Sequence, residues 1–441
     1  MVVLVVIVAL VVAAGYGVYY HVTTTPPNAS VNYSMVNLTG DLGNAFDPGS
    51  IQAFGSNSSS ILLSGVGYTD KTTQFSNASL LRLNSLQPGS TGTELSRITA
   101  DYFHNGTVFG TGWNGTAWLL TGETGFNGTS QAGVIAVEGS YIDNLTATIG
   151  HYFRDGGAWI DAWNGSGWLI GGNSDTAAVL VGYYHGEIIN YTSALGPLPL
   201  HSWIQLIDFN SSAWLVGGHG VFGFLSSGHF TNMLSRTAFA FSGVYSAQFT
   251  GGRWIIGGGP PAGIQIISGN SVESAVSTPS FFNSWVNGIC IYDNSYFIGG
   301  KGLHSNRFYP ALYKMSVSSS GISFQNLSSL LPSSFEGGQV QFMSTISFQN
   351  YTGILIAGQG NYNATTAFST GALAFLTRNV QIGISYVHSS HAFQERHSVQ
   401  SFGPAMDPAS ATHHFFLFLT RTNVAIATAV TPTPPRISKL K

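Results

Sequence analysis

Short apolar runs that end in a pair of glycines recur along most of the chain. The clearest copy is Trp168–Gly172, with the sequence WLIGG, and it follows the turn Trp163–Gly167. A segment of alternating apolar and polar residues leads into each copy, as in residues 286–292. Turns rich in Asn and Gly favour tight β-hairpins because both residues tolerate positive φ. Each copy therefore predicts a hairpin whose second strand stops at the glycines.

The spacing of seven such copies predicts one repeated unit. Two further strands follow each glycine pair, a third such as Ala178–Gly182 and a more polar fourth such as Ile188–Thr192. The copies recur at intervals of roughly 40 to 58 residues, which fits the length of a propeller blade. Four strands per unit without helical periodicity predict an all-β fold, a β-propeller of seven four-stranded blades. A string of β-sandwiches is the alternative, but it needs much longer units. The glycines that end the copies are Gly65, Gly122, Gly172, Gly218, Gly258, Gly300 and Gly358.

The two ends of the repeat region decide how the ring closes. Val36–Leu42 resembles fourth-strand segments such as 143–147, and it precedes the first complete inner strand. We expect this N-terminal segment to complete the last blade as its outer strand, which removes the free edges of the ring. Alternatively, Gly371–Thr377 and Val380–Val387 supply the third and fourth strands of blade seven. A degenerate eighth blade, from about residue 390 to 430, would then accept the N-terminal strand.

The N-terminal segment, residues 1–20, is almost wholly apolar and is long enough to cross a bilayer as a helix. We expect a signal peptide or a transmembrane anchor there, and a buried helix is the alternative. The predicted organisation continues with a linker at 21–30, the propeller at 31–390, a degenerate closing blade or unrelated tail at 391–430, and a basic Pro-rich tail at 431–441.

Charge is unusually scarce, because charged residues make up only 7% of the chain against roughly 25% in ordinary soluble domains. The formal net charge is −3, so phosphate-driven binding of nucleic acid is not expected. A single cysteine, Cys290, excludes an internal disulfide. Few carboxylates also mean few groups to titrate, which suggests weak dependence of stability on pH and an acidic environment.

Sequons of the form Asn-x-Ser/Thr are the densest chemical motif. At the expected hairpins of Asn57, Asn114, Asn164, Asn210 and Asn350, turn formation alone could explain the asparagine. Other sequons fall on expected outer strands, where no turn is needed, and there the motif favours glycosylation. With the apolar N-terminus, this predicts an exported glycoprotein at the cell surface, either membrane-anchored or secreted. The expected glycosylation sites are Asn37, Asn57, Asn77, Asn105, Asn114, Asn127, Asn144, Asn164, Asn190, Asn210, Asn326, Asn350 and Asn363; Asn28 and Asn32 also lie in sequons.

Four apolar residues followed by a glycine pair, once per four-stranded unit, resemble the kelch repeat of propellers like the central domain of galactose oxidase. The resemblance covers most of residues 45–390, although the tyrosine and tryptophan that follow the glycines in kelch blades are missing. The copper-radical enzymes of that group need a cysteine cross-linked to a tyrosine. By the resemblance, Cys290 would be the only candidate for that cysteine here. We expect Cys290 to be a buried structural residue instead. The repeated aromatic residues are expected to pack between blades, namely Trp118, Trp168, Trp214 and Trp254.

The repeat diverges directly after the glycine pair, into mostly polar residues. By the kelch resemblance, this position lies near the loop between the second and third strands, on one face of the ring. Divergence there is expected of a recognition surface, although random loop variation gives the same pattern. The histidines near residues 388–414 have no spacing typical of a metal site, and no catalytic motif or cofactor site is predicted. The candidate ligand residues are Glu123, Asn173, His219, Lys301 and Gln359.

These patterns predict an extracellular, surface-attached propeller glycoprotein for recognition, adhesion or surface structure. The membrane through residues 1–20 and a glycan or surface protein are its expected partners. A secreted carbohydrate-active enzyme is one alternative, and a self-associating subunit of a surface lattice or filament is another. Carboxylates, His and Tyr at the mouth of the ring would favour the enzyme, whereas Gly, Ser and Asn there would argue against it.

Overall fold

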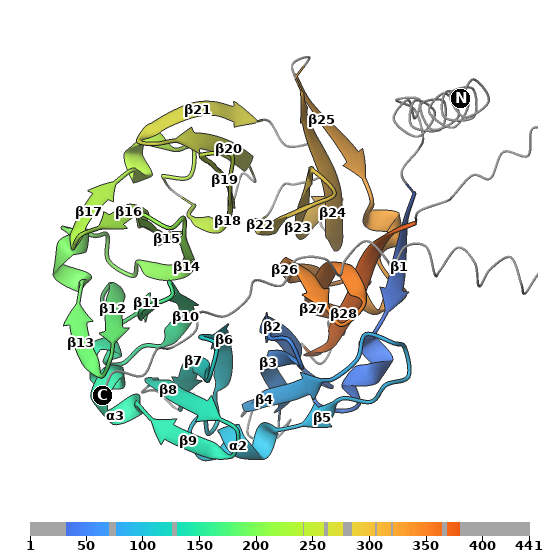
Figure 1. The fold of residues 1–441 in the computed structure, drawn as a ribbon, viewed down its shortest axis with the longest axis horizontal. Coiled ribbons are helices and arrows are strands. Elements are labelled where there is room, and N and C mark those ends of the chain that lie inside the picture. Colours follow the sequence, from blue (N-terminus) through green and yellow to red (C-terminus); the bar gives the residue numbers. More distant parts are fainter. Residues whose placement is uncertain are drawn as a thin grey trace, which may run out of the picture. The chain divides into compact units, whose positions relative to one another are not determined.

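The fold is a seven-bladed all-β propeller, as the repeat predicted (Figure 1). The computed structural model describes residues 32–69, 76–125, 130–240, 242–259, 263–276, 285–304, 307–318, 321–363 and 368–379. All of these lie in one compact unit, Met1–Gln381. Each blade is a four-stranded antiparallel sheet, and in the first six blades the strands follow chain order from the inner strand to the outer one.

The strands of the first six blades have the following bounds. Blade 1 contains β2 (Ser50–Ser56), β3 (Ile61–Thr69), β4 (Ser76–Leu83) and β5 (Thr93–Glu94); blade 2 contains β6 (Thr107–Trp113), β7 (Trp118–Thr124), β8 (Gln131–Glu138) and β9 (Tyr141–Asn144). Blade 3 contains β10 (Ala158–Trp163), β11 (Trp168–Asn173), β12 (Ala178–Tyr184) and β13 (Glu187–Asn190); blade 4 contains β14 (Trp203–Phe209), β15 (Trp214–His219), β16 (Phe222–Ser226) and β17 (His229–Asn232). Blade 5 contains β18 (Val244–Thr250), β19 (Arg253–Gly258), β20 (Gly263–Ser268) and β21 (Ser271–Val276); blade 6 contains β22 (Trp285–Tyr292), β23 (Ser295–His304), β24 (Arg307–Ser318) and β25 (Gly321–Asn326).

Blade 7 combines both ends of the described chain. Its strands are β26 (Gln339–Phe348), β27 (Tyr351–Asn363), β28 (Phe368–Asn379) and, as the outer strand, β1 (Asn32–Asn37). Short helical turns connect the outer strands to the next blade. They are η1 (Thr39–Leu42), α2 (Ser96–Ala100), α3 (Thr146–Ile149), η2 (Gly150–Phe153), η3 (Thr192–Leu195), η4 (Leu234–Arg236), η5 (Ser328–Leu330) and η6 (Ser333–Phe335).

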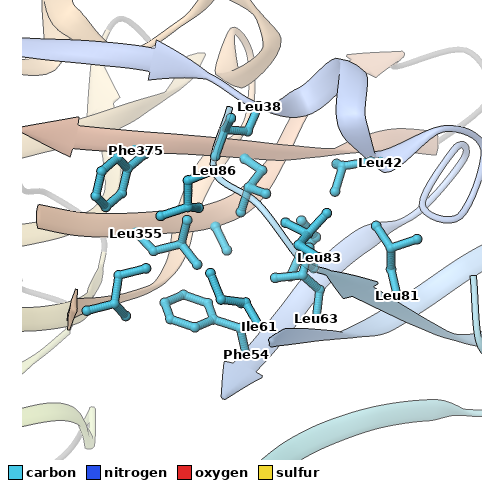
Figure 2. Packing of buried hydrophobic residues seen from close by; sticks show 14 of the residues in the cluster. Leu38, Leu42, Phe54, Ile61, Leu63, Leu81, Leu83, Leu86, Leu355 and Phe375 are labelled. Carbon is cyan, nitrogen blue, oxygen red and sulfur yellow. The ribbon is translucent and has the colours of Figure 1, made fainter. Parts of the chain in front are cut away.

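The N-terminal strand closes the ring, as expected, because β1 pairs antiparallel with β28 along its whole length. The strand lies earlier than the expected Val36–Leu42, since residues 39–42 form the helical turn η1. The pairing continues past β1, where the amide of Leu38 donates to the carbonyl of Leu373 at 3.0 Å. Leu38 and Leu42 then pack with side chains of blades 1 and 7 in a shared core (Figure 2). The alternative of eight blades is therefore wrong, because β1 holds the outer position of blade 7 that was considered for Val380–Val387. Residues 380–441 lie outside the described part.

Aromatic side chains fill the spaces between blades at the hairpin that joins the two innermost strands. Trp168, Trp214 and Trp254 are at most 5% exposed, and Trp118 approaches Gly55 of blade 1 so closely that a side chain on Gly55 would collide with its ring. This confirms the predicted packing. Each of these residues also contacts an aromatic residue across its hairpin at a centroid distance of 4.8–5.2 Å; the pairs are Trp113–Trp118, Trp163–Trp168, Phe209–Trp214 and Phe249–Trp254.

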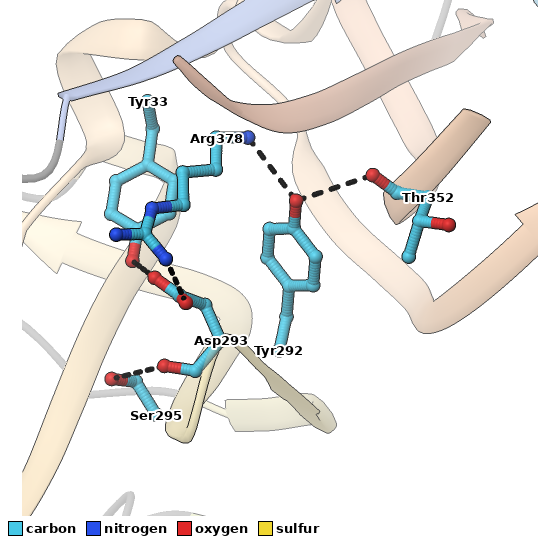
Figure 3. Close-up of polar contacts among 6 residues, drawn as sticks. All are labelled: Tyr33, Tyr292, Asp293, Ser295, Thr352 and Arg378. Carbon is cyan, nitrogen blue, oxygen red and sulfur yellow. Dashed lines mark hydrogen bonds and ion pairs between the residues drawn. The ribbon is translucent and has the colours of Figure 1, made fainter. Parts of the chain in front are cut away.

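A polar cluster fastens the closing strand to blade 6 (Figure 3). The guanidinium of Arg378 in β28 lies 2.7 Å from Asp293, which sits in the β22–β23 turn. The hydroxyl of Tyr33 in β1 donates to the other oxygen of Asp293 at 3.4 Å. Burial and the Asp293 charge raise the pKa of Tyr33 to about 12, so this hydroxyl stays protonated as a donor. Tyr292 adds a bond to the Thr352 carbonyl at 3.2 Å.

Candidate ligand site at the channel mouth

A cavity of about 780 Å³ lies where the inner strands of all seven blades converge. One residue per blade has the same structural position in its wall. Each is the second or third residue of its inner strand, and each lies at a β-bulge. We call these residues the bulge ring: Gln52, Phe109, Trp159, Gln205, Tyr245, Asn287 and Gln341.

The bulge explains why these side chains reach the cavity. In blade 3, Ala158 pairs with Gly172 and Ile160 pairs with Gly171, so Trp159 has no partner in the ladder. An extra residue in one strand bends that strand and re-aims its side chain. The strand must also approach its neighbour closely, because a Cβ on Gly172 would overlap the Gly157 carbonyl oxygen. The second glycine of the repeated pair is thus needed to accommodate the bulge.

Aromatic side chains of blades 2, 3 and 4 lie next to one another at the channel mouth. The ring centroids of Phe109 and Trp159 are 5.8 Å apart, and those of Trp159 and Trp203 are 5.9 Å apart. His219 stacks on Trp203 at 4.5 Å with an interplanar angle of 23°. All four side chains are partly exposed. Blades 2, 3 and 4 therefore present a continuous aromatic arc, defined as Phe109, Trp159, Trp203 and His219.

Amide side chains line the mouth on blades 6, 7 and 1. We call Asn287, Gln339, Gln341 and Gln52 the amide arc. Asn287 donates to the Val340 carbonyl at 3.0 Å, and Gln52 donates to the Ser50 hydroxyl at 2.7 Å, so each retains an amide oxygen as an acceptor. An amide offers two donors and an acceptor oxygen, so this arc can complement hydroxyl groups of either polarity.

The five predicted ligand residues all lie at the mouth end of the blades, but only some meet the cavity. Lys301 lines it, with its ammonium 5.2 Å from the centroid of Trp285, whereas His219 only stacks on the lining residue Trp203. Glu123 is half-buried opposite Thr107. Asn173 instead accepts a bond from the Gly157 amide at 3.2 Å, and Gln359 accepts one from Ser369 at 3.4 Å. A ligand role for these five residues stays a prediction.

Sequence reasoning missed the bulge ring, although the signal was present. Each bulge lies opposite the glycine pair that defines the repeat. The residue to examine was therefore on the lead-in strand across from the glycines, and not the residue after them. Trp159 and Gln205 illustrate this, because each directly follows a buried apolar residue near the start of its lead-in strand, Ala158 or Ile204.

Two carboxyl groups line the cavity below the bulge ring. Asp161 is 8% exposed, and its Oδ2 accepts a bond from the Thr121 hydroxyl at 2.9 Å, while the buried Oδ1 has no partner in the described structure. Burial raises the pKa of Asp161 to about 7. Burial likewise raises the pKa of Asp208 to about 6, against the opposing effect of a bond from the Phe209 amide. Burial also raises the pKa of Glu123.

The sequons have structural roles in the fold. In the four inner hairpins at Asn57, Asn114, Asn164 and Asn210, the Asn Oδ1 accepts two backbone amides and the Ser or Thr hydroxyl at 2.7–3.1 Å. Turn chemistry therefore accounts for these residues. These bonds use Oδ1, so they do not consume the Nδ2 to which a glycan would attach.

The outer-strand sequons were expected to need no turn, and that expectation was wrong. Each of the four outer strands that carry these sequons ends in a short turn that its asparagine caps, with Oδ1 accepting the amide two residues on at 2.8–3.0 Å; the residues are Asn37, Asn144, Asn190 and Asn326. The following hydroxyl bonds to the third strand, as Thr146 does to the Val134 amide at 3.0 Å. These four asparagines are exposed. Asn127 and the side chain of Asn363 lie outside the described part.

Cys290 is 2% exposed in β22, and burial raises the pKa of its thiol to about 12. A thiol that is buried and protonated is a poor nucleophile, which fits the structural role expected for it. Among the described residues, no group of three or more His, Cys, Asp or Glu side chains is placed to hold a metal ion. The histidines at 388–414 lie outside those residues.

No protein-family model matches the sequence, and no curated protein matches it either. Solved structures resemble the fold. A chain in a mitotic checkpoint complex gives a TM-score of 0.50 at 12% identity, covering 80% of this chain and 96% of that one. The propeller domain of the Trilobed protease from Pyrococcus furiosus gives 0.42 at 9%, covering 75% and 94%. YCF48 bound to a D1 peptide gives 0.48 at 10%, covering 80% and 98%. At 12% identity, the likeness to the chain from the mitotic checkpoint complex shows the fold alone, and no match to the kelch family accompanies it.

Proposed function

We propose that this protein is an exported, surface-attached recognition protein that binds its ligand at the channel mouth. The observation that carries the proposal is the bulge ring. Seven equivalent positions surround one cavity, and they hold four amides, two phenyl-type rings and an indole instead of one repeated residue. Loops and strand ends held by a rigid scaffold are where binding residues concentrate. A cavity of this size also falls within the range of small-ligand sites.

Strand direction supports a surface arrangement with the mouth facing outward. β26 begins at the mouth, because Gln339 lines the cavity. Three successive antiparallel pairings then place the start of β1, at Asn32, at the opposite end of blade 7. A membrane anchor in residues 1–20 would therefore join the propeller on the side away from the mouth. No helix within the described residues has the length and apolar character to span a bilayer, and residues 1–31 lie outside them.

The glycoprotein and kelch-like parts of the proposal rest on the sequons and on the repeated glycine pair. The hairpin sequons keep Nδ2 available, and the outer-strand sequons are exposed. Both groups are also explained by turn chemistry, so glycosylation rests on their number together with the apolar N-terminus. The kelch likeness rests on the apolar strand and its glycine pair.

The proposal is tested in the intact source cells and with purified protein. Protease added to intact cells should remove the propeller, and the purified protein should bind a polysaccharide and protein extract of the cell envelope. A double variant that fills the mouth, Gln205→Arg with Gln341→Arg, should lose this binding. Tyr141→Ala, at an outer-strand residue that is 66% exposed, is the control and should bind normally. Protection from protease, or full binding by the filled variant, would contradict the proposal.

A carbohydrate-active enzyme is the second candidate, and the two cavity carboxyls favour it. Glycosidases use a pair of carboxyl groups, one of them with a raised pKa. Asp161 and Asp208 have such raised values, but both Asp161 oxygens are occupied or covered by protein. Substrate contact would require this carboxyl to move. Hydrolysis of envelope polysaccharide that disappears in Asp208→Asn, with binding retained, would support the enzyme over the recognition protein.

A lattice or filament subunit would need a broad apolar side surface. In the described part of the chain, four large apolar side chains are exposed: Tyr141, Ile189, Leu200 and Val317. They lie on blades 2, 3 and 6 and in the loop between β13 and β14. These scattered residues are normal for a soluble surface, so recognition at the mouth is the better supported proposal.

A further inference from the structure

We propose that the channel mouth binds an uncharged oligosaccharide of at least three sugar units, laid along the aromatic arc from blade 2 to blade 4. The inference rests on the proposed function, because it takes the mouth as the ligand site. It adds the chemical class of the ligand and the direction in which the ligand lies.

The aromatic arc supplies consecutive stacking surfaces. The apolar C–H face of a pyranose packs on an aromatic ring and buries area as any apolar group does. Phe109, Trp159 and Trp203 succeed one another at 5.8 and 5.9 Å, a spacing close to the length of one pyranose unit in a chain. Adjacent ring planes are inclined by 48° and 54°, so one sugar can stack on each ring when the chain turns between successive units.

The rings are held in place before a ligand arrives. The Trp203 indole donates to Gln205 at 3.0 Å, and the imidazole of His219 stacks on its ring. A glycine that precedes β10, Gly157, leaves room for the Trp159 indole, because a Cβ at that position would collide with the indole ring. Ordering these side chains in advance lowers the entropy lost on binding.

The amide arc complements the hydroxyl groups that stacking leaves exposed. A sugar hydroxyl both donates and accepts, and so does a carboxamide. Within the described structure, the side chains of Gln339 and Gln341 make no hydrogen bond to protein. A ligand or water must therefore satisfy them, and displacing water costs little when the ligand replaces its bonds.

The charge of the lining argues against an ionic ligand. Among the described lining residues, Lys301 is the only Lys or Arg, and the acidic ones are Asp161 and Asp208. Both carboxyls sit below the bulge ring, and Asp161 is covered. A polyanionic glycan would meet one cation only, whereas Arg-rich sites are typical where anions are bound. A quaternary ammonium ligand would be repelled by Lys301.

The test is a titration followed by tryptophan fluorescence and calorimetry. The probes are α- and β-linked oligomers of glucose and of mannose from one to five units, with oligogalacturonate and choline as charged comparisons. We expect affinity for at least one neutral series to increase with each unit up to three and then to level off. Trp159→Ala should weaken binding of the trimer on the order of tenfold or more, Trp159→Phe should retain most of it, and Tyr141→Ala should leave it unchanged.

Several results would overturn the inference: no binding by any neutral series, affinity independent of chain length, tighter binding of oligogalacturonate, or trimer binding unaffected by both Trp159→Ala and Trp203→Ala in folded protein. Near-wild-type unfolding curves establish that each variant is folded. The two proposals fail differently. If envelope binding is lost in the mouth-filled variant but no neutral oligosaccharide binds, the mouth remains the ligand site and only the ligand class is wrong.

Discussion

The inner strands carry similar side chains from blade to blade at their hairpin end and different side chains at their mouth end. At the hairpin end, blades 2 to 5 repeat one arrangement, an aromatic pair across the turn whose second member packs against the preceding blade. At the mouth end the backbone is equally regular, because every inner strand carries a bulge. The side chains at that bulge nevertheless change from blade to blade.

The difference separates the side chains that stabilise this fold from those that remain available to a ligand. A hairpin-end residue has a register partner and a neighbouring blade to pack against, so few side chains fit. A bulge residue has neither ladder partner nor interblade core, since Trp159 and Gln205 both face the cavity. Its identity is therefore little constrained by packing. The side chain can differ from blade to blade at the bulge because it has no ladder partner and lies outside the core between blades. The same side chains are therefore free to contact a ligand.

The largest expected effect comes from removing one tryptophan at each end. Trp168→Ala should destabilise the protein by about 3–5 kcal/mol, because a fully buried large side chain leaves a cavity between blades. Trp159→Ala, at the partly exposed mouth, should cost roughly 1 kcal/mol or less. Denaturant unfolding of both variants measures the difference. Equal losses would show that the mouth rings are part of the core.

An effect of comparable total size, and of opposite direction to acid denaturation, comes from the titration of Asp161. Its pKa is about 7 in the folded protein and near 3.8 when unfolded, so the folded state binds more protons between these values. Stability is fully present below the unfolded pKa and falls as pH rises through the window, by about 1.4 kcal/mol per pH unit at most. The loss is complete above the folded pKa.

Unfolding curves at pH 4, 5, 6 and 7 check this prediction. The Asp161→Asn variant cannot titrate and should show a distinctly flatter pH dependence, with the remainder due to groups such as Asp208. A wild type that gains stability between pH 4 and 7 would contradict it. Scarce carboxylates predict weak pH dependence for the chain as a whole, and buried carboxyls in the channel wall are the exception.

The next largest effect on stability is expected at the hairpin sequons, at the end of the inner strands away from the mouth. Asn164→Ala removes the Oδ1 that accepts the Ser166 and Gly167 amides and should cost about 1 kcal/mol, the usual value of such a cap. Asn164→Asp keeps an acceptor oxygen but destroys the sequon, so it should be nearly as stable as wild type in unglycosylated protein. If the aspartate variant loses as much stability as the alanine variant, the acceptor oxygen is not what stabilises the turn. Thermal unfolding of protein made in a host without N-glycosylation measures both.

The fold could be predicted from the sequence because the residues that pack the blades recur at regular intervals along the chain. The glycine pairs, the aromatic residues and the closing segment near Val36 all have one physical solution, and each was found where expected. The bounds of the last blade were harder to predict. Two segments competed for one outer position, and only the pairing of β1 with β28 decides between them.

For the candidate site, the sequence predicted the end of the ring but not the residues that line the cavity. Glu123, His219 and Lys301 are near the mouth because they follow the glycines, but the bulge ring faces it because of a register shift that no periodicity reveals. Sequon counting could not separate glycosylation sites from turn residues for a related reason. An asparagine that caps a turn and one that carries a glycan read alike, and the hydrogen bonds of Asn144 and Asn190 become visible only in three dimensions.

The smallest effect is expected at the closing strand, where β1 meets blade 6. The Arg378–Asp293 pair has ideal length, but its side chains are 44% and 20% exposed, and solvent screening holds such pairs to about 0–1 kcal/mol. Arg378→Met keeps the alkyl packing and removes the charge, so it should change the unfolding midpoint slightly. Leu38→Ala, in the shared core of blades 1 and 7 that Figure 2 shows, should cost about 2–5 kcal/mol. If the arginine variant instead releases β1, seen as fast amide exchange at Val36 in an otherwise folded ring, the polar cluster and not the apolar core closes the propeller. We expect the core to dominate, because burial at Leu38 is complete while the ion pair stays in contact with water.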